Sequence, residues 1–276
     1  MKPMRAIALS VALSAPAVAC APAMLRPPET SLFLATVYDV QAAPAPAGEQ
    51  LVARGEPLLE QPMRFRGLFE LDGTVPVPAE RPRLAQGTSA PGAGSLLFEV
   101  KTGSAIVGCV LPSAAVPTAG QWLPCLVDAN RDGRFEGLFF GRSADIPVPT
   151  VSGYVPLNRI MALAEPVGYR RLDPAAPGEP LSVSIRHSNR FDLLRRSHIE
   201  TWVQGPLGAG RLPGTVAFRP SGTPDDILVL NARLRLRSAP DRAIEVQVLE
   251  PMPPQALTMP DVRKNDWIPI PIPMQR

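Results

Sequence analysis

The chain has 276 residues, 45% of them hydrophobic, which allows one large β domain or two smaller ones with a sizeable core. Its 35 prolines argue against long helices, because proline breaks a helix interior, and favour short, interrupted strands. Two of the 28 basic residues and no acidic residue lie in residues 1–19, so without that segment 26 basic residues face 25 acidic ones. The charge balance then gives no support for nucleic-acid binding, which needs an excess of positive charge.

Residues 1–19 are predicted to be a secretory signal peptide. Lys2 and Arg5 precede an apolar run over residues 6–19. That run is shorter than the roughly 20 apolar residues that span a bilayer, and it ends in small residues typical of a cleavage site. We therefore expect export, with an ordinary buried helix as the alternative.

The residues before Cys20 allow two cleavage routes. Ala17, Val18 and Ala19 have the small-x-small pattern of ordinary signal peptidase, which would release a soluble chain. The sequence AVAC that ends at Cys20 also resembles the bacterial lipobox. That resemblance implies a lipid on the Cys20 thiol, a tether over residues 20–30 and, because Ala21 is not Asp, the outer membrane.

Cys109 and Cys125 are predicted to form a disulfide bond. They are the even pair that remains when Cys20 carries a lipid, and an exported protein matures in an oxidising compartment. The bond would close a loop of about 15 residues and stabilise the fold by roughly 3 kcal/mol in the chain-entropy model. Two buried free thiols are the alternative.

Segments rich in β-branched and aromatic residues predict strands in two blocks. The first block lies within residues 31–150, and its strands are expected at 31–40, 63–71, 95–111 as a hairpin, 122–128 and 134–141. The second block lies within residues 151–276, and its strands are expected at 181–187, 198–204, 214–220, 226–238 and 243–250. We expect a mainly β, antiparallel, sandwich-like fold of one or two units, split near residue 150, with little helix beyond the signal peptide.

Two segments of the second block raise alternatives. Arg233, Arg235 and Arg237 alternate with apolar residues and share one face of a strand. This pattern is typical of a solvated sheet face, and a binding surface for anionic glycan or lipid headgroups is the alternative. In the C-terminal tail, prolines at every second position from Pro269 to Pro273 favour a protected edge strand, with a polyproline-type docking tail as the alternative.

The stretch CLVDANRDGRFEG, residues 125–137, is the most specific chemical pattern. It resembles the first three quarters of an EF-hand loop, with Gly133 at the sharp bend. The candidate calcium ligands are Asp128, Asn130, Asp132, the backbone carbonyl of Arg134, and Glu136. Position 12 is Phe139 instead of Glu and the flanks look like strands, so we expect an isolated structural site with a weak affinity of about 10⁻⁴ to 10⁻³ M. The alternative is an Asx-rich hairpin turn whose side chains bind backbone N–H groups.

No catalytic motif is evident. The chain has no GxSxG sequence, and its only histidines are His187 and His198. A metal or triad site would have to combine them with residues such as Asp192 and Glu200, but we expect the histidines to face solvent.

We therefore predict an exported, lipid-anchored envelope protein, in the outer membrane or else periplasmic or secreted, with a non-catalytic structural or binding role. A protein or glycan partner is expected. The alternative is a secreted carbohydrate-active hydrolase, which would need a carboxylate pair in a groove, or a glycan-binding module. An aromatic platform would favour the binding module, but Trp122, Trp202 and Trp267 are few and scattered in the sequence.

Overall fold

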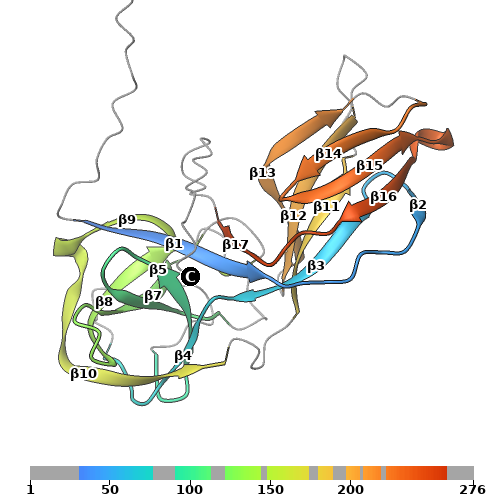
Figure 1. Ribbon diagram of the computed structural model, residues 1–276. Helices are drawn as coiled ribbons and strands as arrows, with labels where there is room; N and C mark the ends of the chain where they lie inside the picture. Colours follow the sequence, from blue (N-terminus) through green and yellow to red (C-terminus); the bar gives the residue numbers. More distant parts are fainter. Residues whose placement is uncertain are drawn as a thin grey trace, which may run out of the picture.

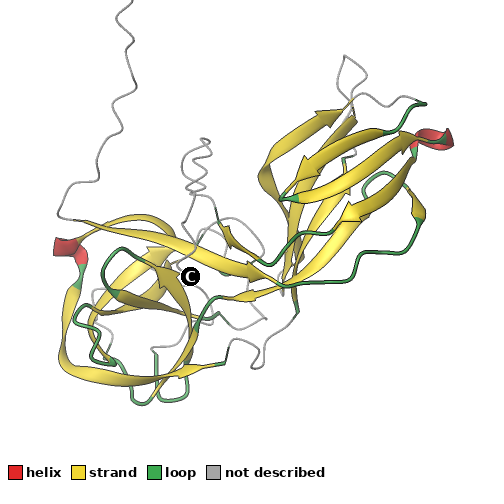
Figure 2. Ribbon diagram, in the orientation of Figure 1, coloured by secondary structure: helices red, strands yellow, loops and turns green. Residues whose placement is uncertain are grey.

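The described part of the protein is almost entirely antiparallel β structure (Figure 2). The computed structural model describes residues 31–76, 91–112, 122–143, 148–173, 180–188, 197–205, 208–218 and 222–259. Two single turns of 3-10 helix, η1 (Leu157–Arg159) and η2 (Pro240–Arg242), are the only helical segments in these ranges. Across the same residues, none of the helices has the length and apolar character needed to cross a bilayer. The expectation of a mainly β, antiparallel chain is confirmed.

Six strands close into a barrel, which lies at the lower left of Figure 1. In order around the barrel they are β5 (Leu96–Lys101), β4 (Leu68–Leu71), β10 (Met161–Leu172), β8 (Arg134–Arg142), β7 (Trp122–Asp128) and β6 (Ile106–Val110). The pairing of β6 with β5, from Leu97 opposite Val110 to Val100 opposite Val107, completes the ring. We expected a sandwich here. Alternation of buried and exposed residues is common to barrels and sandwiches, so this pattern does not show whether a sheet closes on itself.

The barrel has a packed interior. Phe69, Phe135 and Tyr169 pack against one another there, with ring centroids 4.2 to 6.1 Å apart. Gly108 of β6 faces these rings, and a Cβ at this position would lie 3.1 Å from Phe69 Cδ2. The rings therefore leave no room for a side chain at position 108, in keeping with the dense packing of protein cores.

The outer face of the barrel carries a second hydrophobic cluster. Alternate residues of β6 and β7, such as Val107, Cys109, Cys125 and Val127, belong to this outer cluster and are buried. β1 (Ser31–Val40) and β9 (Ser152–Pro156) pair with each other and cross the barrel near this face (Figure 1). The barrel is thus covered on one side by the N-terminal strand of the described chain.

Two further sheets form the rest of the molecule, at the upper right of Figure 1. One continues from β1 through β3 (Pro57–Phe65), β11 (Leu181–His187) and β12 (Ser197–Gly205) to β13 (Gly208–Phe218), and β17 (Gln255–Thr258) pairs with β1. The other, separate sheet has the order β14 (Asp225–Val229), β15 (Ala232–Ser238), β16 (Ile244–Glu250) and β2 (Glu49–Val52). The buried hydrophobic residues of both sheets belong to one hydrophobic cluster.

Strand pairing crosses the domain boundary expected near residue 150. β10 follows that boundary in the chain, yet it is part of the barrel. β2 and β3 precede it, yet they pair with β16 and β11. The predicted signal peptide, Cys20, the predicted tether and the proline-rich tail after residue 259 lie outside the described residues.

Cys109 and Cys125 form the expected disulfide. They sit directly opposite each other on β6 and β7, both are fully buried, and they are 16 positions apart in the sequence. The bond joins the consecutive barrel strands β6 and β7, so it holds their register from the outer face.

Replacing both cysteines by alanine is expected to lower the free energy of unfolding by about 3 kcal/mol, because the unfolded chain regains the entropy of an open loop. Urea unfolding followed by circular dichroism would measure the change. The single variants Cys109→Ala and Cys125→Ala should each lose most of the same free energy of unfolding, because either one removes the disulfide. Two titratable thiols in the denatured, non-reduced wild-type protein would contradict the disulfide.

Candidate binding groove

A groove of about 650 Å³ lies beside β8 and β9, within the range usual for ligand sites. We call it the aromatic groove. Its described lining comes from β1, β7, β8, β9, η1 and the start of β10: Leu34, Trp122, Phe139, Phe140, Gly141, Arg142, Val151, Ser152, Gly153, Tyr154, Val155, Pro156, Asn158, Arg159 and Met161.

Two aromatic side chains of the groove reach solvent. Trp122, the first residue of β7, is 36% exposed, and Tyr154 of β9 is 46% exposed. The ring of Tyr154 also contacts Phe33 at 5.3 Å between centroids, which supports it from β1. Two partly exposed rings on one groove therefore offer apolar surface to whatever enters it.

Positively charged and polar groups lie beside these rings. Arg142 ends β8 directly opposite Trp122, while Asn158 and Arg159 come from η1, and all three are exposed. Neither arginine forms an ion pair with another described residue. Guanidinium donors next to aromatic faces suit a ligand that combines an apolar surface with negative charge.

Part of this groove was accessible to sequence reasoning. In the hairpin around the acidic turn, the first residue of β7 lies opposite the last residue of β8. Counting residues outward from the turn therefore predicts that Trp122 lies opposite Arg142. Tyr154 and Arg159 lie in a segment with no clear alternation, and only the pairing of β9 with β1 brings them to the same groove.

The acidic loop between β7 and β8 is a tight turn organised by Asp128. This carboxylate is fully buried and accepts hydrogen bonds from the backbone N–H groups of Arg131, Asp132 and Gly133. It also accepts one from the Tyr169 hydroxyl at 2.8 Å. Burial and the adjacent Asp128 charge raise the pKa of Tyr169, so its hydroxyl stays protonated and donates.

The other proposed calcium ligands also bind within the loop. Asn130 accepts from the Asp132 N–H, Asp132 accepts from the Arg134 N–H, and Glu136 Oε1 accepts from the Ala129 N–H. Glu136 Oε2 is buried without a partner among the described residues. No group of three His, Cys, Asp or Glu side chains is arranged as a metal site in the described ranges. These contacts are those of the Asx-rich turn, and the calcium site stays a prediction.

Replacing Asp128 by Asn is expected to lower the free energy of unfolding by about 2 kcal/mol, because a charged acceptor of four hydrogen bonds becomes a neutral amide with N–H groups facing donors. Asp132→Asn is the matched control and should change stability by less than half as much, since Asp132 is exposed. Thermal melting measures both. A wild-type melting temperature equal to that of Asp128→Asn would contradict the role of Asp128 in the turn. A rise in wild-type melting temperature with millimolar calcium, absent in Asp128→Asn, would establish the metal site in addition.

The two histidines lie on neighbouring strands, His187 on β11 and His198 on β12, and His187 lines one cavity together with Glu200. His187 is buried at the end of β11, with its ring 6.4 Å from that of Phe218, so the expectation that it faces solvent was wrong. Burial and the positive charge of Arg54 lower the pKa of His187 to about 4, which leaves it neutral at pH 7. Asp192 lies outside the described residues.

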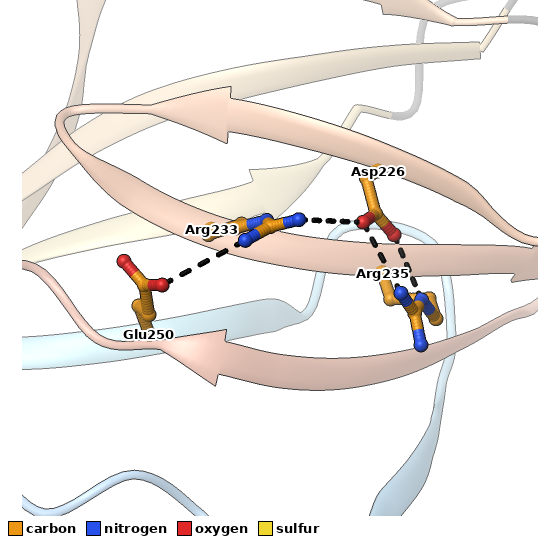
Figure 3. A network of polar contacts seen from close by, with 4 residues as sticks. All are labelled: Asp226, Arg233, Arg235 and Glu250. Carbon is orange, nitrogen blue, oxygen red and sulfur yellow. Dashed lines mark hydrogen bonds and ion pairs between the residues drawn. The ribbon is translucent and has the colours of Figure 1, made fainter.

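The three arginines of β15 form ion pairs on the exposed face of their sheet. In Figure 3, Asp226 lies between Arg233 and Arg235, and Glu250 reaches Arg233 from the other side. Arg237 pairs with Glu245 and lies 3.8 Å from Glu49. The arginines are thus matched by acids from neighbouring strands, which favours a solvated face over an anion-binding surface.

No protein-family model, no characterised protein and no solved structure matches this chain. Its function is therefore inferred from the geometry of its own side chains. Of the features above, the aromatic groove alone combines a ligand-sized volume with exposed rings and arginines that pair with no described acid.

Proposed function

We propose that the chain is an exported, lipid-anchored protein of the cell envelope with a non-catalytic binding role, and that the aromatic groove holds its ligand. Residues 1–19 would be removed and Cys20 would carry the lipid, at the outer membrane. The buried Cys109–Cys125 disulfide supports an oxidising compartment. The sheet of β3, β11, β12 and β13 and the four-stranded sheet of β14, β15, β16 and β2 would form a sandwich-like unit beside the barrel, and weakly bound calcium would reinforce the acidic loop.

The observation that carries the binding role is the placement of Trp122 and Tyr154 on one groove, beside Arg142 and Arg159. Sugar rings have apolar faces that can stack on aromatic side chains, and acidic sugars carry carboxylates that guanidinium groups bind well. An acidic glycan therefore fits this groove better than a neutral one.

The alternative function, a carbohydrate-active hydrolase, would require two carboxylates flanking the bond that is cleaved. The described lining of the aromatic groove supplies rings, amides and guanidinium groups, which are the chemistry of binding. An envelope protein with this groove would hold a glycan strand without cutting it.

Export and anchoring predict a mature protein that begins at an acylated Cys20. After fractionation of cells that express the full chain, the protein should partition with membranes, and its N-terminal peptide should carry lipid by mass spectrometry. Cys20→Ala should release the chain from the membrane. Intact, unprocessed protein in the cytoplasmic extract would overturn this part of the proposal.

The groove is tested by titrating the mature, non-acylated protein with oligogalacturonate and, in parallel, with a neutral cello-oligosaccharide. Trp122→Ala and Tyr154→Ala should each weaken oligogalacturonate binding by roughly tenfold, because each removes one stacking surface. Trp122→Phe keeps a ring and should lose less. Arg142→Gln should weaken the acidic ligand more than the neutral one.

A variant on a different surface controls for general effects of charge. Arg235→Gln removes an arginine that already pairs with Asp226, so it should leave oligogalacturonate binding unchanged. Equal binding by wild-type protein and the Trp122→Ala, Tyr154→Ala double variant would overturn the binding role of the groove.

A further inference from the structure

A second cavity, of about 440 Å³, lies at the end of β11 and β12, away from the barrel. Its described lining is Gly55, Arg186, His187, Ser188, Glu200, Trp202 and Arg211. We call it the arginine cavity. Charged side chains make up much of its wall, whereas most cavities of this size are apolar.

Glu200 is the buried anchor of the cavity. Only 4% of it is exposed, yet it carries a carboxylate. Arg211 Nη1 donates to one carboxylate oxygen at 3.1 Å, and Trp202 Nε1 donates to the other at 3.2 Å. A buried carboxylate needs such partners, and in return it fixes the positions of the guanidinium group and the indole.

Arg186 is fixed from the neighbouring strand. Its guanidinium carbon lies 5.3 Å from the centre of the Trp202 ring, and its Nε donates to Ser184 Oγ at 2.9 Å. Strand register places Arg186 directly opposite Glu200. Two arginines thus approach one cavity from β11 and β13 with their side chains already ordered, which lowers the entropy cost of binding a ligand.

The charge of the described lining of the arginine cavity favours an anion. Among these lining residues, Arg186 and Arg211 contribute two positive charges and Glu200 contributes one negative charge, and the charge of Arg54 acts on the adjoining His187. Among the described contacts, Arg186 donates only to Ser184, and Arg211 donates only to Glu200. Each guanidinium group therefore has donors left for an oxygen-rich ligand.

We propose that the arginine cavity binds an oxyanion, the carboxylate or phosphate group of a small molecule, between Arg186 and Arg211. Trp202 and Glu200 position the two guanidinium groups and do not contact the charge directly. This site is separate from the aromatic groove, so its test does not depend on whether the aromatic groove binds a glycan.

Calorimetric titration of the mature protein with inorganic phosphate and, separately, with malonate tests the proposal at low ionic strength. At least one of the two should bind, and the stronger one identifies phosphate or carboxylate as the preferred group. Arg186→Gln and Arg211→Gln should each weaken that binding by at least tenfold, because each removes half of the anion's donors. Arg186→Lys keeps the charge without the planar fork and should give an intermediate loss.

Two controls separate a built site from general attraction of anions. Arg235→Gln lowers the net charge by the same amount at a surface arginine paired with Asp226, and it should leave binding unchanged. Thermal melting should show that the Arg186→Lys variant folds as the wild-type protein does. The proposal is overturned if neither anion binds, if Arg186→Lys and Arg211→Gln bind as the wild type does, or if Arg235→Gln weakens binding equally.

Discussion

The fold depends on one strand, β1, that both parts of the molecule share. Its residues 34–38 are all buried, and near Thr36 its partners change from β5 and β9 to β3 and β17. At that point the Thr36 hydroxyl bridges both backbone groups of Val151, accepting from its N–H and donating to its carbonyl. Backbone groups at a change of partner would otherwise be buried without hydrogen bonds, which is costly. A single buried threonine therefore lets one strand serve two sheets.

The same bridge positions the aromatic groove. Val151 is the residue before β9, and its side chain lies over Gly141, where an added Cβ would come within 2.6 Å of Val151 Cγ1 and 3.0 Å of Cys125 Sγ. The close approach of β9 to the barrel thus requires Gly141, the disulfide beneath it and the Thr36 bridge together. Tyr154 and Trp122 meet across a groove whose walls are fixed by these contacts, so the site is largely formed before any ligand arrives.

Local patterns in the sequence predicted the parts of this fold that local physics determines. The β5–β6 and β7–β8 hairpins, the alternation of β15 and the Cys109–Cys125 bond follow from residue type, turn chemistry and parity. β10 was missed because only Val167 among its twelve residues is buried, so it lacks the alternation that marks a strand. Closure of the barrel and the sharing of β1 depend on pairings between distant segments, which a single sequence does not encode in any short window. For the same reason the sequence alone does not bring Tyr154 to the groove of Trp122, whereas the pairing of β9 with β1 does.

Arginine is used in two different ways in this protein, and the contrast identifies where ligands bind. On β15, Arg233, Arg235 and Arg237 each meet an acid from an adjacent strand, so their charges are neutralised in place and contribute little to stability or recognition (Figure 3). In the arginine cavity, Arg211 pairs with Glu200 and Arg186 pairs with no described acid, which leaves positive charge in excess among the described lining residues. Because the effective dielectric constant falls in such a cavity, each remaining donor interacts more strongly with an anion than the same group on an open sheet face. Unequal pairing, more than the number of arginines, decides which surface of this protein binds negative charge.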